Sequence, residues 1–456
     1  MVPGKSHGRR LPPGQHHGMG VGRGKVRGLA QLVHLDSYAA LGGGPLERRH
    51  VDVAGALQHD EAYAEHDCPS GHTKMNPIVG SDGLKDPKRA RRDVQPAGRI
   101  HNFGAGPAVL PLEVVEEVAA ALPNLADSGF GLLEVSHRSP PFQSVIDSAE
   151  DRIRRVLSVP DDYEVLFLQG GASTQFYMTA LNLMEEGQKA DFLVTGGWSQ
   201  KALEEASRAG EASSVWDDSD NGFKSVPQDG DYSIREDAAY VHYTSNNTLY
   251  GTQFHHLPDS GGKPRVVDAS SDICGVPLDV SSHDVIYAGA QKNLGPSGVT
   301  LVILSPWALS RGIQGIPTML DYHTHVSKGS MFNTPNTFGI FVLDRVFAWI
   351  ERNGGLEGAI ERNRAKAALL YNELDRSDFW RPHAHGGSRS VMNVTWRLSD
   401  EDLEGAFLAE AAASGLGGLK GHRSVGGIRA SMYNGCPIES VEALVGFMRD
   451  FESRHG

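Results

Sequence analysis

The sequence predicts an α/β fold with a mostly parallel sheet flanked by helices, followed by a smaller C-terminal α/β domain. From about Ile100 onward, short apolar segments alternate with segments of helical length. After about residue 360 the pattern changes to longer helices with a few strands. The 456 residues are enough for two packed domains. Strands that alternate with helices pair in parallel, because each crossover helix returns the chain to the same end of the sheet.

Six apolar segments are expected to be buried strands, and several intervening segments are expected to be helices. The strands are residues 164–168, 191–194, 240–243, 265–267, 285–287 and 300–304. Pro111 opens a helix whose stripe is Val114, Val115, Val118 and Leu122. Further helices are expected at residues 174–184, 201–209, 338–350 and 438–451.

Residues 1–98 differ from the rest of the chain. They are rich in Gly, His, Arg and Pro and hold eight of the twenty histidines. We expect a disordered or non-native N-terminal extension there, with a start at Met75 and a targeting role as open alternatives. The spacing of His16, His17 and the other histidines matches no usual metal site, so no metal is expected. The further predicted boundaries are an arm at 99–115, a large cofactor-binding domain at 116–360 and a small domain at 361–456.

Composition narrows the class of partner. The formal net charge of −13 argues against nucleic acid, because binding a phosphate backbone needs surplus Lys and Arg. No stretch approaches the roughly 20 apolar residues of a membrane span, so no membrane partner is expected. Three scattered cysteines favour a reducing compartment, and we expect a cytoplasmic protein, with organelle targeting by the extension left open.

Two features at the predicted strand ends could bind a phosphorylated, nitrogen-containing ring. Residues 169–174 (QGGAST) join a strand to a helix, and small residues before a helix N-terminus let backbone N–H groups approach a phosphate. Such a turn is by itself often only a turn. Asp268 follows the strand 265–267, where a carboxylate could pair with a protonated ring nitrogen. A lone Asp at this place is more often a cap or turn residue.

Two more residues add an amine and a flat ring at strand ends. Lys292 follows a buried strand among small residues, a setting that suits a Schiff-base lysine of lowered pKa. Trp198 follows the strand 191–194 and could stack on an aromatic cofactor, although a lone Trp is more often part of the core. Together the four features supply what pyridoxal 5′-phosphate (PLP) needs: a phosphate cradle, a stacking partner, an acid for the pyridine nitrogen and an amine.

Five cationic candidates stand apart from these. They are His137, Arg138, His422, Arg423 and Arg429. Each by itself is more often solvated or structural. Because Arg makes bidentate contacts to carboxylate and phosphate, several that converge would suit a substrate that carries both groups.

Five separated motifs resemble the phosphoserine aminotransferases, a family in class V of the fold-type I PLP-dependent transferases. The resemblance covers about residue 100 to the C-terminus, and its motifs are NFGAGP (102–107), EVSHR (134–138), YAGAQKN (287–293), GSMFNTP (329–335) and GHRSVGGIRAS (421–431). It implies fold type I, PLP as cofactor and a homodimer. It also implies reversible amino transfer from L-glutamate to a phosphorylated keto acid, 3-phosphohydroxypyruvate. The products are O-phospho-L-serine, in L-serine biosynthesis, and 2-oxoglutarate, and some relatives also act in pyridoxine biosynthesis.

The resemblance assigns a role to each matching residue. Lys292 is implied as the Schiff-base lysine and Asp268 as the partner of the pyridine nitrogen, the two catalytic residues. The implied cofactor contacts are the stacking Trp198, the polar Thr248 and Gln291, the backbone N–H groups of Ala172 and Ser173, and Asn333 and Thr334 from the other subunit. Arg429 is implied to hold the substrate α-carboxylate, and His137, Arg138, His422 and Arg423 its phosphate.

Three other interpretations of the sequence compete with this one. Two are further class V enzymes, a serine–glyoxylate aminotransferase and a cysteine desulfurase. A desulfurase needs a nucleophilic cysteine on a mobile loop, and the settings of Cys274 and Cys436 do not suggest one. The third is a non-catalytic protein that retains the fold, and it would be expected to lack Lys292 or Asp268.

Overall fold

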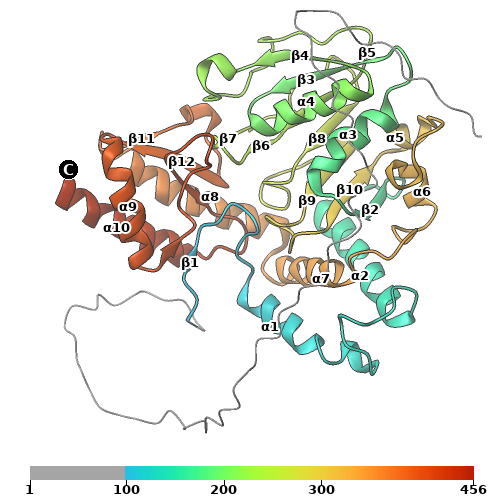
Figure 1. The fold of residues 1–456 in the computed structure, drawn as a ribbon, viewed down its shortest axis with the longest axis horizontal. Helices are drawn as coiled ribbons and strands as arrows, with labels where there is room; N and C mark the ends of the chain where they lie inside the picture. The colour runs from blue at the N-terminus through green and yellow to red at the C-terminus, as the bar shows by residue number, and fades with distance from the viewer. Residues whose placement is uncertain (1–97) are drawn as a thin grey trace, which may run out of the picture. The chain divides into compact units, whose positions relative to one another are not determined.

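The computed structural model describes residues 98–456. Apart from Gly98, the predictions for residues 1–98, including the start at Met75 and the pair His16 and His17, lie outside the described residues. Figure 1 shows the described chain as a central sheet wrapped by helices, with a C-terminal group of helices and short strands beside it.

The central sheet has seven strands in the order β2-β10-β9-β8-β5-β3-β4. Strand β10 is antiparallel to both neighbours and the other pairs are parallel, so the mostly parallel sheet is confirmed. The strands are β2 (Glu164–Leu168), β3 (Lys189–Val194), β4 (Glu211–Asp217), β5 (Ala238–Thr244), β8 (Arg265–Asp268), β9 (Val285–Gly289) and β10 (Thr300–Leu304). Strand β4 is missing from the sequence prediction, because it lies at the edge of the sheet and its sequence EASSVWD is largely polar.

Helices cover this sheet and supply much of its core. They are α1 (Leu112–Ala121), α2 (Pro140–Leu157), α3 (Gly171–Leu183), α4 (Gly197–Ala209), α5 (Pro306–Ser310), α6 (Tyr322–Val326) and α7 (Thr337–Arg352). The predicted stripe of α1 is partly wrong. Val114 is fully buried and Val118 packs on the core, whereas Val115 and Leu122 are exposed. The helical repeat puts Val114, Val118 and Ala121 on one face and leaves Val115 on its flank.

The C-terminal part has its own apolar core around a three-stranded sheet of order β11-β12-β14. Its elements are β11 (Trp380–Pro382), β12 (Asn393–Leu398), β14 (Ile428–Ser431), α8 (Gly355–Leu374), α9 (Glu404–Ala413) and α10 (Ile438–His455). Phe103 and Val109 of the N-terminal arm also belong to this core, and β1 (His101–Asn102) pairs with β13 (Leu416–Gly417). The boundary predicted at 360/361 falls inside α8 and stays a prediction.

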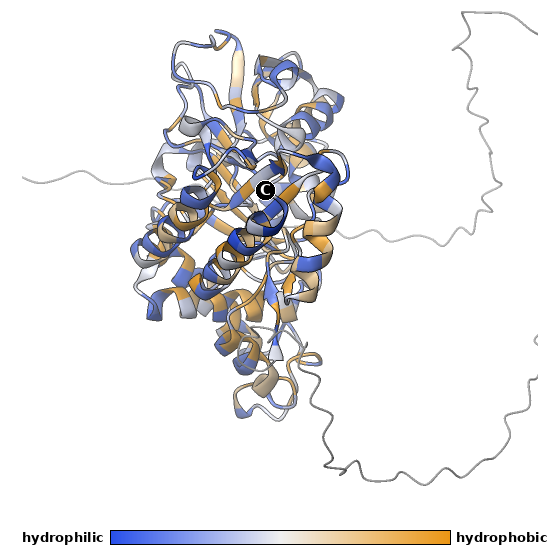
Figure 2. Ribbon diagram, turned by 90° about the vertical axis from the view of Figure 1, so that its left-hand side faces the viewer, coloured by the Kyte–Doolittle hydropathy of each residue, from blue (hydrophilic) through white to orange (hydrophobic). Residues whose placement is uncertain are grey.

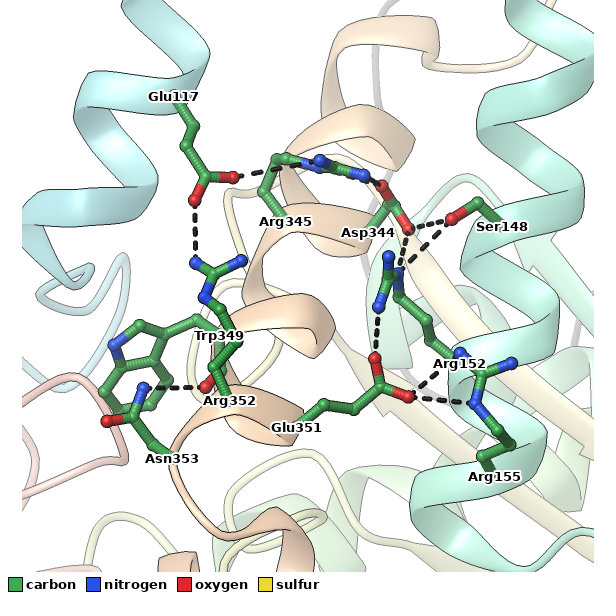
Figure 3. Close-up of polar contacts among 10 residues, drawn as sticks. All are labelled: Glu117, Ser148, Arg152, Arg155, Asp344, Arg345, Trp349, Glu351, Arg352 and Asn353. Carbon is green, nitrogen blue, oxygen red and sulfur yellow. Dashed lines mark hydrogen bonds and ion pairs between the residues drawn. The ribbon is translucent and has the colours of Figure 1, made fainter.

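Charged side chains join α7 to α1 and α2 (Figure 3). The buried Asp344 accepts hydrogen bonds from Ser148 Oγ at 2.9 Å and Arg152 Nε at 3.0 Å, both on α2. On the other side of α7, Arg352 Nη2 donates to Glu117 of α1 at 2.7 Å. A buried carboxylate needs such partners, because an unpaired one would lose its hydration without compensation.

Hydropathy follows the layers. In Figure 2 the outer faces of the helices are largely blue and orange residues gather in the interior. Within residues 98–456, no helix combines the length and the apolarity that crossing a membrane requires. The same part of the chain holds no group of three or more His, Cys, Asp or Glu side chains arranged to bind a metal ion.

Candidate active site

Lys292 lies just beyond the carboxyl end of β9, with its side chain partly buried. Its Nζ donates hydrogen bonds to Thr248 Oγ1 and Ser271 Oγ, each at 2.8 Å. The pKa of this amine is lowered to about 8, chiefly by burial and to a lesser extent by the charge of Arg429, while the carboxylates Asp268 and Asp272 act in the opposite direction. A lysine with such a pKa keeps an appreciable neutral fraction near pH 7, which nucleophilic attack on a carbonyl needs.

Asp268 is the last residue of β8 rather than the residue after the strand, and it is buried. Its Oδ1 accepts the N–H of Ser270 at 3.0 Å. Burial raises the pKa of this carboxyl, while the charge of Lys292 and the hydrogen bonds from Ser270 lower it. No ion pair to Asp268 is present in the described part of the chain, so its carboxylate can pair with a cation brought by a ligand.

The predicted phosphate cradle is a glycine turn that leads into α3. Gly170 and Gly171 have φ of 94° and 67°, a backbone conformation that glycine adopts at little cost. A Cβ on Gly170 would lie 1.9 Å from Thr174 Oγ1, so a larger residue would clash there. No side chain caps α3, and its first turn, which includes Ala172 and Ser173, therefore offers N–H groups to an anion.

A second predicted segment meets this cradle. Gln169 Nε2 donates to the carbonyl oxygen of Thr334 at 3.1 Å, within the same chain. Asn333 and Thr334 are both exposed, and Phe332 before them is exposed as well. The loop 332–334 is therefore accessible beside the helix terminus, on the surface of this subunit.

Trp198 and Gln291 are the next two predicted cofactor contacts. Trp198 lies in the first turn of α4, half-buried, and its buried Nε1 has no hydrogen-bond partner among the described residues. Lys201 Nζ lies 4.6 Å from the centroid of the indole ring. Gln291 precedes Lys292, and a Cβ on Gly289 would lie 2.7 Å from Gln291 Oε1. Gly289 thus leaves space for the Gln291 amide.

Arg429, on β14, is buried and reaches the lysine site. Its Nη1 donates to the carbonyl oxygen of Thr248 at 3.1 Å. Its buried Nε has no hydrogen-bond partner among the described residues, and burial lowers the pKa of the guanidinium. An incompletely paired, buried guanidinium gains most from an anionic ligand.

The remaining cations fall into two places. His422 accepts or donates one hydrogen bond with Ser424 Oγ at 2.7 Å. Its pKa is lowered first by burial and then by the charges of Arg429, Arg423 and Lys201, so these side chains share one electropositive region.

His137 and Arg138 form the second place. Arg138 Nε donates to His137 Nε2 at 3.2 Å. Within the described part of this single chain, no hydrogen bond or ion pair joins His137 or Arg138 to Lys292 or to His422. Their predicted role at the substrate phosphate therefore stays a prediction.

Ser271, Asp272 and Lys201 are not among the site residues predicted from the sequence. Ser271 and Asp272 belong to the run DASSD (268–272), and the density of polar residues directly after a buried strand was a usable signal. Lys201 carries no such signal, because only the turn of α4 brings its amine over Trp198.

Known proteins with similar sequences and structures share one description. Residues 100–444 match the family "Aminotransferase class-V". The phosphoserine aminotransferase of Desulfotalea psychrophila is 50% identical over 359 residues, which cover 79% of this chain and 99% of that protein. That of Lysinibacillus sphaericus is 49% identical over 358 residues, 78% of this chain and 99% of that protein.

Solved structures agree with the sequence matches. Phosphoserine aminotransferase from Bacillus circulans subsp. alkalophilus superposes with a TM-score of 0.77 at 45% identity, covering 78% of this chain and 99% of that one. The PLP-bound phosphoserine aminotransferase from Trichomonas vaginalis has a TM-score of 0.73 at 36% identity, covering 77% and 100%. The chain therefore belongs to the phosphoserine aminotransferase family of the class V aminotransferases.

Proposed function

We propose that this protein is a PLP-dependent aminotransferase that transfers the amino group of L-glutamate to 3-phosphohydroxypyruvate, giving O-phospho-L-serine and 2-oxoglutarate. The observation that carries the proposal is the Lys292 amine, held by Thr248 and Ser271 with the charges of Asp268 and Arg429 acting on it. It occurs in a chain that is 50% identical to a phosphoserine aminotransferase over 99% of that protein's length. The reaction belongs to L-serine biosynthesis.

The residues present fit PLP. The uncapped N-terminus of α3 suits the phosphate, Trp198 suits one ring face, and buried Asp268 suits a protonated ring nitrogen. Thr248, Gln291 and the backbone of Ala172 and Ser173 complete this set, with Asn333 and Thr334 contributed by the other subunit of a homodimer. When bound, PLP supplies an electron sink that stabilises negative charge at the substrate Cα.

The side chains of this protein then orient the substrate and move its proton. Lys292 accepts the proton that leaves the substrate Cα in one half-reaction. In the other half-reaction it donates a proton to the Cα of the new amino acid, so it acts as a general acid–base. Thr248 and Ser271 keep its amine in place by their hydrogen bonds of 2.8 Å. Arg429 binds the α-carboxylate through its unpartnered Nε edge.

The substrate phosphate is bound by His422 and Arg423, together with His137 and Arg138. The region around His422 is electropositive although the whole chain carries a formal charge of −13. A local cluster is needed, because the acidic remainder of the surface would otherwise repel a substrate with phosphate and carboxylate groups.

Three further properties belong to the proposal. A homodimer is supported by exposed apolar side chains of Phe130, Leu133 and Phe332, which would be covered by a partner near Asn333 and Thr334. A cytoplasmic location is supported by Cys274 and Cys436, which are buried free thiols. A second activity toward 4-phosphohydroxy-L-threonine in pyridoxine biosynthesis would use the same electropositive region.

The desulfurase alternative gains no support from the described cysteines. Cys274 and Cys436 are both buried, and burial raises the pKa of each thiol. A nucleophilic cysteine needs an accessible thiol of lowered pKa instead.

Visible spectroscopy of the purified, PLP-loaded protein tests the proposal. We expect an absorption band of lysine-bound cofactor that is lost in Lys292→Ala and kept in the control Lys263→Ala, whose amine contacts the Glu236 carbonyl. O-phospho-L-serine should convert this band, whereas L-serine and L-cysteine should barely change it. Equal conversion by all three amino acids would contradict the substrate assignment, and no band in the wild type would contradict the cofactor assignment.

A further inference from the structure

A second buried carboxylate, Asp272, lies one turn beyond Asp268 at the end of β8. Its side chain is 1% exposed, less than the 4% of Asp268. The N–H of Asp272 donates to the carbonyl oxygen of Ala269 at 3.2 Å, so the chain turns back toward the strand end. Neither the cofactor contacts nor the substrate contacts proposed above use this side chain.

Both carboxylate oxygens of Asp272 have neutral partners. Ser245 Oγ donates to Oδ1 at 2.5 Å, and Gln253 Nε2 donates to Oδ2 at 2.9 Å. The partners are fixed in turn: the N–H of Ser245 donates to the Asp268 carbonyl at 3.0 Å, and Gln253 Oε1 accepts the N–H of Val391 at 2.9 Å. The orientation of the carboxylate is therefore set by the backbone of β8 and by the segment before β12.

No cation within ion-pair distance neutralises Asp272 in the described part of the chain, unlike Asp344, which has Arg152 and Arg345. A buried charge without an ion pair is costly, and hydrogen bonds to neutral groups recover only part of the lost hydration. An apolar residue or an amide would avoid that cost. Ser271, the residue directly before Asp272, accepts a hydrogen bond from the Lys292 amine at 2.8 Å, so this carboxylate lies one residue from a direct contact of the lysine.

We propose that Asp272 is a positioning residue for the lysine, whose negative charge, held in place by Ser245 and Gln253, favours the protonated form of the Lys292 amine. This inference rests on the proposed function, because it assigns a role at the same lysine. Asp268 cannot do this alone once a ligand cation pairs with it, since its charge is then shared. Asp272 remains as a second carboxylate, which the proposed cofactor and substrate contacts do not use.

The electrostatics agree with this role. Asp272 and Asp268 both raise the pKa of Lys292, against the lowering by burial and by Arg429. Burial raises the pKa of Asp272 to about 6, with hydrogen bonds from Ser245 and Gln253 and the charge of Lys292 opposing the rise. Asp272 is therefore mostly ionised at pH 7 and loses its charge below about pH 6.

Other titratable groups also face this carboxylate. The buried hydroxyls of Tyr243 and Tyr433 have their pKa raised, in part by Asp272. A cavity of about 490 Å³ borders Asp272, Tyr243 and the histidines His255, His256 and His283. On this side the Tyr243 hydroxyl is hydrogen-bonded to His283 Nε2 at 2.6 Å.

The test measures the pKa of Lys292 directly in the full-length protein. Amines are labelled at trace level with an acylating reagent from pH 6 to pH 11, and the Lys292 peptide is quantified by mass spectrometry. Asp272→Asn removes the charge with little change of shape, and we expect the labelling midpoint of Lys292 to fall by about one pH unit. Asp344→Asn is the matched control, a buried carboxylate on α7, and should leave the midpoint unchanged.

A second variant covers the case in which Asp272→Asn does not fold. Ser245→Ala removes the 2.5 Å hydrogen bond and keeps the carboxylate, so the pKa of Asp272 rises and its charge is partly lost near pH 8. The Lys292 midpoint should then fall by a few tenths of a pH unit. An unchanged midpoint in whichever variant folds, or an equal fall in Asp344→Asn, would overturn the inference.

The labelling result separates this inference from the proposed function. Labelling is carried out on the cofactor-free protein, because PLP bound to Lys292 would block its amine, so the result is independent of PLP binding. A wild-type protein with no PLP band but a shifted midpoint in Asp272→Asn would contradict the function and keep the electrostatic role. A normal PLP band with an unshifted midpoint would do the reverse.

Discussion

Replacing Lys292 by methionine should stabilise the cofactor-free protein at neutral pH. The pKa of this lysine falls from 10.5 to about 8 in the folded chain, chiefly because its charge is buried. A difference of that size corresponds to about 3 kcal/mol at about 1.4 kcal/mol per pH unit. Because the side chain keeps some exposure, we expect about 1 to 2 kcal/mol.

Methionine has nearly the length of lysine and carries no charge to desolvate. The hydroxyls of Thr248 and Ser271 lose their hydrogen bonds to the Lys292 amine, but they remain hydrogen-bonded to each other, with Oγ1 and Oγ 2.6 Å apart. The substitution therefore leaves no buried hydroxyl without a partner.

The stability difference between the wild type and Lys292→Met should depend on pH. Between pH 8 and 10.5 the unfolded lysine binds a proton that the folded one has released, so the stability of the wild type rises with pH across this window. The advantage of Lys292→Met should be complete below pH 8 and absent above pH 10.5.

Urea unfolding of both cofactor-free proteins at pH 7 and at pH 10 measures the effect. A variant that is less stable than the wild type at pH 7 would refute the reasoning. So would an advantage of the same size at both pH values, because packing rather than charge would then be its cause.

Three further predictions address the substrate site, the C-terminal core and assembly. Arg429→Gln should raise the KM for L-glutamate about 100-fold, since a charge-assisted contact to the carboxylate is lost. Arg155→Gln, in an exposed ion pair with Glu351, should leave steady-state kinetics unchanged, and equal effects would contradict the role of Arg429. Phe407→Ala should lower the free energy of unfolding by about 3 to 5 kcal/mol, because this fully buried ring packs against Trp380 and Trp396. Urea unfolding followed by tryptophan fluorescence measures the loss, and a value under about 1 kcal/mol would show that the site collapses to fill the cavity. Leu133→Glu, at a side chain that is 71% exposed, should shift size-exclusion elution toward the monomer, whereas the control Leu257→Glu should not. An unchanged dimer in Leu133→Glu would show that Leu133 does not lie in the dimer interface.

Much of the fold could be predicted from local pattern. Strands β2 and β10 have the predicted bounds, because short apolar runs in a buried sheet carry a signal that neighbouring residues do not alter. Strand β4 and the exposed side of α1 could not be predicted this way, since an edge position and a helix face are defined by what packs on them.

The residues of the candidate site also fall into those that the sequence predicts and those that only the tertiary structure placed. From the sequence by itself, Lys292, Asp268, Trp198 and Arg429 can be predicted as site residues, because each stands in a segment whose residue types limit the chemistry that it can perform. Only the tertiary structure placed Ser271 against the lysine amine and Lys201 over Trp198. It alone showed that Asp272 is buried without an ion pair, since burial and charge balance depend on segments far apart in the chain, such as those that hold Ser245 and Gln253.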